Sequence, residues 1–180
     1  MKADIKAHNL SFIPFIDKKT LKEKVNKLGK KLRKQFKGKV PLLIGVLNGS
    51  FIFAADLMRA MNAECEITFI KLSSYEGMKS TAEIKTHIGL EIDVEGRDVV
   101  IVEDIIDTGN TLHNFLLDLQ KFKPASVTVV ALLVKPDALQ HDLQIDYRGF
   151  DIPDKFVIGY GLDYNGIGRN LREIYQLKED

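Results

Sequence analysis

The stretch VVIVEDIIDTGNTL, residues 99–112, decides the fold. Its four leading apolar residues are typical of a buried strand, and the strand runs directly into two carboxylates, Glu103 and Asp104. Two isoleucines later, the segment DTGNT (107–111) brings small and hydroxyl-bearing residues to the point where a helical pattern begins. Packing alone does not explain two acids at the end of a buried strand. The stretch therefore predicts a binding site between a strand and a helix.

The segments on either side alternate between strand and helix patterns. Strands are predicted at VPLLIGVL (40–47), EITFIKL (66–72), HIGLEI (87–92) and SVTVVALLV (126–134). Helices are predicted at about 21–36, at 51–61 and after Thr111. This alternation predicts an α/β fold with a doubly wound, mostly parallel sheet. The tail from about residue 145 is rich in Gly, Asp and aromatic residues, which predicts a loop-rich lobe at the end of the sheet.

The composition is that of an ordinary globular domain, with 180 residues of which 45% are hydrophobic and 28% charged. Cys65 is the single cysteine, so no internal disulfide can form, and its expected role is packing. No apolar run is long enough to cross a bilayer, and the first ten residues lack the apolar stretch of a signal peptide. We therefore expect a cytoplasmic protein with no membrane partner.

Residues 18–39 hold eleven Lys or Arg and one acid, although the whole chain carries a net charge of only +1. Contact with nucleic acid is one interpretation of this basic block. The favoured one is an amphipathic helix with a solvated lysine face, because apolar residues recur at helical spacing at Leu21, Val25, Leu28, Leu32 and Phe36. No nucleic-acid partner is expected on this interpretation.

The DTGNT turn has the chemistry of a phosphate site. In an open parallel sheet, ligands bind beyond the carboxyl ends of the strands, and the N–H groups at a helix N-terminus attract anions. Carboxylates beside a phosphate would repel it unless they receive sugar hydroxyls or hold a divalent cation, so a phosphorylated sugar is the predicted ligand. Two alternatives for the tripeptide are a simple helix cap by Asp107 or Thr108 and the catalytic Asp-Thr-Gly of pepsin-like proteases, which requires an all-β setting.

The whole stretch resembles the phosphoribosyl-diphosphate motif of the type I phosphoribosyltransferases, in particular their hypoxanthine (hypoxanthine-guanine) branch. Four further segments agree with that family in order and spacing: 46–57, 73–81, 132–136 and 152–169. The resemblance implies a twisted, mostly parallel sheet flanked by helices, in a single domain of residues 1–180. A small hood lobe would come from the N-terminal segment and from residues after about 145. It also implies transfer of a 5-phosphoribosyl group from 5-phosphoribosyl 1-diphosphate to N9 of hypoxanthine, or of guanine, with Mg²⁺ as cofactor.

The resemblance also assigns roles to the acidic turn. Glu103 and Asp104 would bind the ribose hydroxyls and Mg²⁺. The 5'-phosphate would be held by Asp107, Thr108, Gly109, Asn110 and Thr111. Asp107 would serve in addition as the general base that takes the N7 proton of the purine, a role that a positioned carboxylate can fill.

The remaining roles fall on the other matching segments. The family places purine contacts at Lys135, Phe156, Val157 and Asp163, a second Mg²⁺ role at Asp163, pyrophosphate contacts at Leu47, Asn48, Gly49 and Arg169, and a lid that carries Ser74 and Tyr75. Lys135 would donate to the 6-oxo group and Phe156 would stack on the ring. The alternatives are that Lys135 reaches to solvent, that Phe156 packs in the core, that Asp163 caps a turn, and that the loop is an ordinary surface loop.

Two positions depart from the family pattern. Asn48 stands where the family often has lysine, and Glu76 stands where a glycine is usual in the lid. The backbone role of the first turn is expected to persist, with a non-proline cis peptide between Leu47 and Asn48. Since family members are usually dimers or tetramers, a homodimer or homotetramer is expected. The rival hypothesis is a non-catalytic regulator on the same fold that senses nucleotides or binds RNA through the basic helix.

Overall fold

The computed structural model describes residues 4–72, 86–88 and 92–179. Its larger sheet consists of β3 (Leu42–Leu47), β4 (Glu66–Leu72), β5 (Thr86–Ile88), β6 (Asp98–Ile106), β7 (Ser126–Val134) and β8 (Tyr147–Asp151). The strands lie in the order β5-β4-β3-β6-β7-β8. Those from β4 to β8 are parallel, while β5 pairs antiparallel with β4. The predicted α/β fold with a mostly parallel sheet is confirmed.

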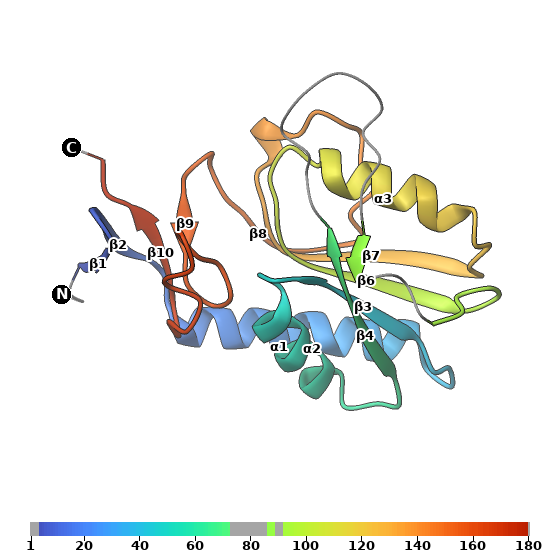
Figure 1. Cartoon of the computed structure of the whole chain (residues 1–180). Coiled ribbons are helices and arrows are strands. Elements are labelled where there is room, and N and C mark those ends of the chain that lie inside the picture. The colour runs from blue at the N-terminus through green and yellow to red at the C-terminus, as the bar shows by residue number, and fades with distance from the viewer. Residues whose placement is uncertain (1–3, 73–85, 89–91, 180) are drawn as a thin grey trace, which may run out of the picture.

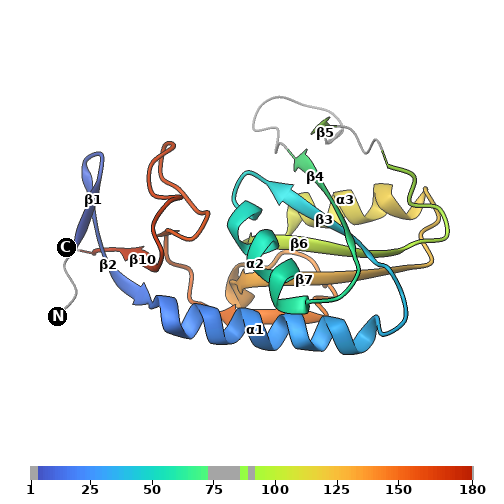
Figure 2. The same cartoon turned by 90° about the horizontal axis from the view of Figure 1, so that it is seen from below.

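Three helices cover the two faces of this sheet. Helices α1 (Lys18–Gln35) and α2 (Phe51–Met61) lie on one face, and α3 (Asn110–Gln120) lies on the other (Figures 1 and 2). A short 3₁₀ helix, η1 (Pro136–Ala138), follows β7. A hydrophobic core lies on each face of the sheet, and successive residues of β6 pack in different cores. Val100 and Val102 pack with the residues of α1 and α2, and Ile101 packs with those of α3. A strand buried on both faces must be apolar throughout, which explains the continuous apolar runs in the sequence.

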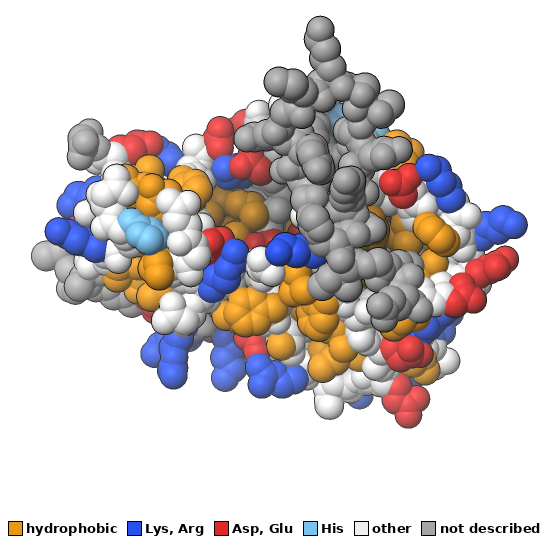
Figure 3. Space-filling view, viewed as in Figure 1, with side chains coloured by type: hydrophobic (Ala, Val, Ile, Leu, Met, Phe, Trp, Pro, Cys, Tyr) orange, Lys and Arg blue, Asp and Glu red, His pale blue; other side chains and the backbone are white. Residues whose placement is uncertain are grey.

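The basic block forms α1 as an amphipathic helix. Asp17 caps its N-terminus by accepting the N–H groups of Lys19 and Thr20 at 2.8 and 3.0 Å. Each residue of the predicted stripe is buried. Lys and Arg side chains line the lower edge of the molecule in Figure 3, where α1 runs in Figure 1. The lysines therefore form a solvated helix face, as the favoured interpretation predicted.

A smaller antiparallel sheet forms a second lobe at one end of the molecule (Figure 1). Its strands are β1 (Ile5–Ala7), β2 (Leu10–Ile16), β9 (Val157–Ile158) and β10 (Ile174–Leu177), in the order β1-β2-β10-β9. The lobe connects to α1 through the end of β2, where the N–H of Lys18 donates to Glu173 Oε1 at 3.3 Å. Both ends of the described chain lie in this lobe.

Several predicted boundaries differ from the structure. Strand β6 continues through Ile106, so Glu103 and Asp104 lie within the strand and not after it. Helix α1 begins at Lys18 and ends at Gln35, whereas it was predicted at about 21–36, and Gly38 lies in the following turn with a φ of 76°. Strand β8 belongs to the larger sheet although it lies in the stretch after residue 145 that was assigned to the hood. None of the helices in the described part of the chain is long and apolar enough to cross a membrane.

Candidate functional site

The site lies at the carboxyl edge of the larger sheet. Strands β3, β6 and β7 are adjacent and parallel, so their last residues meet at one edge. The ladder of β6 and β7 pairs Ile106 with Val134, and it is extended by the N–H of Lys135, which donates to the carbonyl of Ile106 at 2.9 Å. The edge therefore brings together the turn at 47–49, the acids of β6 and the residue that follows β7.

The two acids of β6 are held in a poorly solvated place. Glu103 is buried, and burial together with the charge of Asp104 raises the pKa of Glu103 well above its usual value. Burial raises the pKa of Asp104 to about 6, against the opposing effect of two backbone hydrogen bonds and of Arg169, while Asp163 adds to the rise. Desolvation of a carboxylate without a full set of partners has this effect. The pair is therefore ready to accept a cation or hydroxyl donors.

Asp104 packs directly against the turn that follows β3. Among the described residues the one cis peptide bond joins Leu47 and Asn48, as the resemblance predicted. Gly49 lies next in this turn, and any Cβ there would overlap with the carboxylate of Asp104. Asn48 is exposed while Gly49 is buried. The backbone of the turn, and not its side chains, therefore faces the acids of β6.

The DTGNT turn encloses a small cavity. Its volume is about 150 Å³, and its walls come from Glu103, from residues 105–109 and from residues 111–112. Gly109 opens α3 with a φ of 78°, and no side chain caps the helix. The first N–H groups of a helix have no partner within the helix, so those of α3 remain available to an anion. The simple helix cap proposed for Asp107 or Thr108 is not the arrangement found; Thr108 Oγ1 only receives the N–H of Asn110 at 3.4 Å.

Asn110 belongs to a polar network that the sequence did not predict. Its Nδ2 donates to Gln140 Oε1 at 2.9 Å, and its Oδ1 lies 2.6 Å from Nε2 of His141. The ring of His141 stacks on that of His113 of α3, with centroids 4.1 Å apart and planes at 2°. The loop after η1 therefore holds the side chain of Asn110 within the DTGNT turn.

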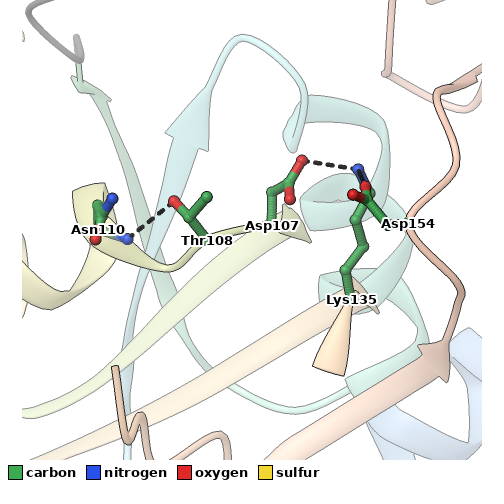
Figure 4. A network of polar contacts seen from close by, with 5 residues as sticks. All are labelled: Asp107, Thr108, Asn110, Lys135 and Asp154. Atoms are coloured by element: carbon green, nitrogen blue, oxygen red, sulfur yellow. Dashed lines mark hydrogen bonds and ion pairs between the residues drawn. The ribbon is translucent and has the colours of Figure 1, made fainter. Parts of the chain in front are cut away.

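Lys135 lies between two carboxylates (Figure 4). Its Nζ is 2.7 Å from Asp107 Oδ2 and 2.9 Å from Asp154 Oδ1. The residue is only 6% exposed, so the alternative that it reaches to solvent is wrong. Burial by itself lowers the pKa of Lys135, but the hydrogen bonds and charges of Asp107 and Asp154 outweigh it and raise the pKa. Lys135 is therefore a buried ammonium group whose charge is balanced by the carboxylates.

An aromatic cluster lies in the smaller lobe. The Phe156 ring is 44% exposed, so it is not a core residue, and it lies 6.2 Å from the ring of Phe12 and 5.7 Å from that of Tyr164. The next residue, Val157, is buried and pairs with Gln176 in the smaller sheet. An exposed ring held by two other rings offers a flat apolar surface, which suits a planar ligand.

The glycine-rich segment after β9 closes against the turn at 47–49. A Cβ on Gly161, whose φ is 107°, would overlap with the carbonyl oxygen of Gly49. Arg169 Nη1 donates to the carbonyl of Gly161 at 2.7 Å, and its Nη2 lies 2.7 Å from Asp163 Oδ1. Asp163 Oδ2 accepts the N–H of Gly166 at 2.7 Å, so Asp163 does cap a turn here. An arginine fork is thereby fixed next to the 47–49 turn.

Comparison with known proteins identifies the family. The model of the phosphoribosyl transferase domain family matches residues 16–165. The chain belongs to the phosphoribosyltransferases. It is 43% identical over 159 residues to the hypoxanthine-guanine phosphoribosyltransferase of Lactococcus lactis, a match that covers 88% of this chain and 86% of that protein. It is also 43% identical to the bifunctional protein TilS/HprT of Listeria monocytogenes over 92% of this chain, and it spans 26% of that longer protein.

Solved structures support the same family assignment. The fold resembles a crystal structure of a hypoxanthine-guanine phosphoribosyltransferase from Bacillus anthracis, which has a HEPES molecule in its active site. The TM-score is 0.87 at 38% identity, and the match covers 92% of this chain and 98% of that one. The type I phosphoribosyltransferase fold predicted from the motif is therefore confirmed.

The edge of this phosphoribosyltransferase sheet gathers most of the predicted site residues, but not all of them can be placed. Ser74 and Tyr75 of the predicted lid, and Glu76 beside them, lie outside the described residues. Among the described residues, no three His, Cys, Asp or Glu side chains are arranged to hold a metal ion. Asp154, Gln140 and His141 were not predicted. The IPDKF segment of the family motif contains Asp154, but its pairing with Lys135 depends on tertiary structure.

A larger cleft in the described part of this phosphoribosyltransferase lies elsewhere. It measures about 530 Å³ and lies between α1, α2 and residues 170–172, and none of the predicted site residues lines it. Size alone would make it the first choice for a ligand. We place the site at the edge of the sheet nevertheless, because the buried carboxylates, the open helix N-terminus and the arginine fork converge there and not in the larger cleft.

Proposed function

We propose that the chain is a hypoxanthine phosphoribosyltransferase of purine salvage. It transfers the 5-phosphoribosyl group of 5-phosphoribosyl 1-diphosphate to N9 of hypoxanthine, and of guanine, to give IMP or GMP and pyrophosphate. Relatives with the name hypoxanthine-guanine phosphoribosyltransferase cover most of the chain. The single observation in the structure that carries the proposal is the pairing of Lys135 with Asp107 at the ends of adjacent strands, 2.7 Å apart.

This pair fits one edge of a 6-oxopurine, where the 6-oxo group and N7 are neighbours. In the reaction, N9 attacks the anomeric carbon, the bond from that carbon to pyrophosphate breaks, and the ring releases the proton on N7. Asp107, exposed at the end of β6, would take that proton. Lys135 would donate to the 6-oxo group, which selects hypoxanthine and guanine over adenine because an ammonium group has no acceptor for an amino group. Phe156 would stack on the ring, and the backbone of Val157 together with Asp163 would contact the base.

The rest of the edge suits the phosphorylated sugar. The cavity in the DTGNT turn would hold the 5'-phosphate against the N-terminus of α3, with Thr108, Gly109 and Thr111 among its walls and Asn110 as a further contact. The backbone of Leu47, Asn48 and Gly49 and the guanidinium of Arg169 would bind the pyrophosphate. The fixed fork of Arg169, next to the backbone of this turn, supports that assignment.

The acidic residues fit Mg²⁺ that arrives with the substrate. Glu103, Asp104 and Asp163 offer only carboxylate oxygens, which are the ligands that Mg²⁺ prefers, and burial raises the pKa of the first two, so a nearby cation would favour their charged forms. They do not form a complete cage of protein ligands. Mg²⁺ usually keeps water and substrate oxygens in its coordination shell, so an incomplete set is suitable. When bound, Mg²⁺ would neutralise the charge of the departing pyrophosphate.

The setting of the enzyme is part of the proposal. The chain acts in the cytoplasm on small-molecule substrates, as a single domain in which the smaller lobe covers the edge of the larger sheet. It assembles into a homodimer or a homotetramer, and Ser74 and Tyr75 close over the sugar during the reaction. Exclusion of water at this stage would protect a cation-like transition state from hydrolysis.

The test is a turnover assay with 5-phosphoribosyl 1-diphosphate and Mg²⁺, in which hypoxanthine, guanine, xanthine and adenine are compared. We expect hypoxanthine and guanine to react and adenine not to react. RNA binding is measured in parallel against salt concentration, since the rival regulator requires tight binding with a steep salt dependence. Absence of turnover with every purine, in a protein that binds the diphosphate donor, would reject the enzymatic function.

A further inference from the structure

The two carboxylates that hold Lys135 come from different parts of the chain (Figure 4). Asp107 directly follows β6, in the turn proposed to bind the phosphate, whereas Asp154 follows β8 on the way to the smaller lobe. Both distances to Nζ are those of charge-assisted hydrogen bonds, 2.7 and 2.9 Å. Asp107 has an assigned task in the proposed reaction. Asp154 has none.

The turn that carries Asp154 is anchored next to Lys135 itself. The N–H of the buried Ile152 donates to the carbonyl of Val134 at 2.8 Å, and Val134 is the residue before Lys135. A tight turn follows, in which the N–H of Lys155 donates to the carbonyl of Pro153 at 2.7 Å. The backbone therefore fixes Asp154 relative to Lys135, and the next turn of chain leads to Phe156.

Asp107 cannot act as the counter-ion of Lys135 throughout the reaction. When its carboxylate takes the N7 proton, an O–H bond forms, the electron pair of the N7–H bond returns to the purine ring, and Asp107 becomes neutral. Lys135 then keeps a positive charge in a buried place while one of its two anions is lost. A buried charge without a partner is strongly unfavourable. Asp154 is the carboxylate that remains.

We propose that Asp154 is a specificity-determining positioning residue: it keeps Lys135 charged and directed at the 6-oxo group while Asp107 handles the N7 proton. This inference rests on the proposed function. An ammonium group has three N–H donors. With one donor fixed by Asp154, the others serve Asp107 and the carbonyl oxygen of the purine. Loss of Asp154 would leave Asp107 as the sole anion and would draw Lys135 away from the base.

The first arm of the test uses the free protein. Lysine side chains are isotope-labelled, and NMR follows the Lys135 signal against pH, with the signal assigned by its absence in Lys135→Met. The pH midpoint is expected to fall in Asp154→Asn and to return in Asp154→Glu. The matched control is Asp151→Asn, an exposed aspartate at the end of β8 that does not contact Lys135. An unchanged midpoint in Asp154→Asn, with the variant folded, would overturn the proposal.

The second arm measures steady-state kinetics. In Asp154→Asn we expect the KM for hypoxanthine to rise about tenfold to hundredfold, with little change in the KM for 5-phosphoribosyl 1-diphosphate. Asp154→Glu should recover most of the loss. An equal rise in both KM values, or no rise in either, would contradict a role in purine recognition. If the wild-type protein turns over no purine, the proposed function fails, and the NMR midpoint still decides whether Asp154 maintains the charge of Lys135.

Discussion

The carboxylate of Asp104 lies against the α-carbon of Gly49, so closely that a methyl group at position 49 would occupy the same space. We expect Gly49→Ala to displace either the 47–49 turn or Asp104. Overpacking of this kind costs about 1 to 3 kcal/mol of stability, and it should also remove most of the activity because both partners belong to the donor site. Thermal unfolding and turnover are the measurements.

Gly38→Ala is the control for this substitution. Gly38 also has no side chain, but a Cβ there would meet nothing, and the positive φ adds only backbone strain of about 1 to 2 kcal/mol. Its activity should therefore stay near the wild-type value. If Gly49→Ala retained as much activity as Gly38→Ala, the close approach of Asp104 to the turn would not be required for activity.

Stability should depend on the protonation of Asp104. Its folded pKa is about 6 against an ordinary value of 3.8, mainly because of burial. Between these values the folded protein holds a proton on Asp104 that the unfolded chain has released, so the contribution of Asp104 to stability falls as the pH rises from about 4 to about 6 and then levels off. The full loss is at most about 3 kcal/mol. Thermal unfolding of the free protein across this range is the measurement.

Asp104→Asn isolates this contribution from that of Glu103, whose pKa is also raised. The variant should match the wild type near pH 4 and be more stable than the wild type at pH 7.5, while it loses activity. If the unfolding temperatures of the two proteins changed in parallel over the whole pH range, the charge of Asp104 would not destabilise the folded state.

Asp107→Asn should lower kcat by about 10² to 10⁴, because the amide cannot take the N7 proton. Binding of IMP, measured by calorimetry, should persist, since the amide oxygen still accepts a hydrogen bond from Lys135. Asp118→Asn is the control, because Asp118 lies in the last turn of α3, at the opposite end of the helix from the site, and forms an exposed ion pair with Lys121. Equal rates in Asp107→Asn and Asp118→Asn would remove Asp107 from the mechanism.

Lys135→Met should reduce kcat/KM for hypoxanthine by about ten- to hundredfold, as expected for loss of a charged hydrogen bond. Discrimination against adenine should weaken in the same variant. Stability should change little, because the two carboxylates left behind are 52% and 70% exposed and regain water. Lys135→Arg should not restore activity, since the planar guanidinium cannot place its N–H donors as the compact ammonium group of lysine does. Full activity in either variant would contradict the assigned contact.

Phe156→Ala should raise the KM for hypoxanthine about tenfold with only a small loss of stability, because the ring is half-exposed and its stacking on a base is worth about 1 to 3 kcal/mol. Phe122→Ala is the matched control: that ring is 57% exposed just after α3 and belongs to no part of the site. A similar KM in both variants would reject Phe156 as the surface that receives the purine.

The elements of the fold could be predicted because their signals are local. Strands β4 and β7 and helix α2 match their predicted bounds from end to end, since continuous apolar runs and helical spacing report burial directly. The end of β6 was predicted too early. Two charged residues look like the end of a strand, but here Glu103 and Asp104 stay in the strand, and Ile105 and Ile106 continue its pairing with β7.

The contacts of the site could be predicted only in part. The motif named Asp107 and Lys135, but their pairing depends on the parallel register of β6 and β7. Asp154 joins them only because the chain after β8 folds back onto the end of β7, at a sequence distance of 19 residues. His141 and Gln140 reach Asn110 for a similar reason, through the loop after η1. Long-range contacts of this kind leave no periodic signal in the sequence.

Because of the contact between Gly161 and Gly49, the two ends of the site differ in how readily substitutions can change them. At the donor end, main chain meets main chain, and a side chain fits at neither glycine, so altered selectivity would require several segments to move together. At the acceptor end, the exposed ring of Phe156 can be replaced without moving the backbone. Single substitutions can therefore change the selectivity for the base, while the selectivity for the phosphoribosyl donor stays the same.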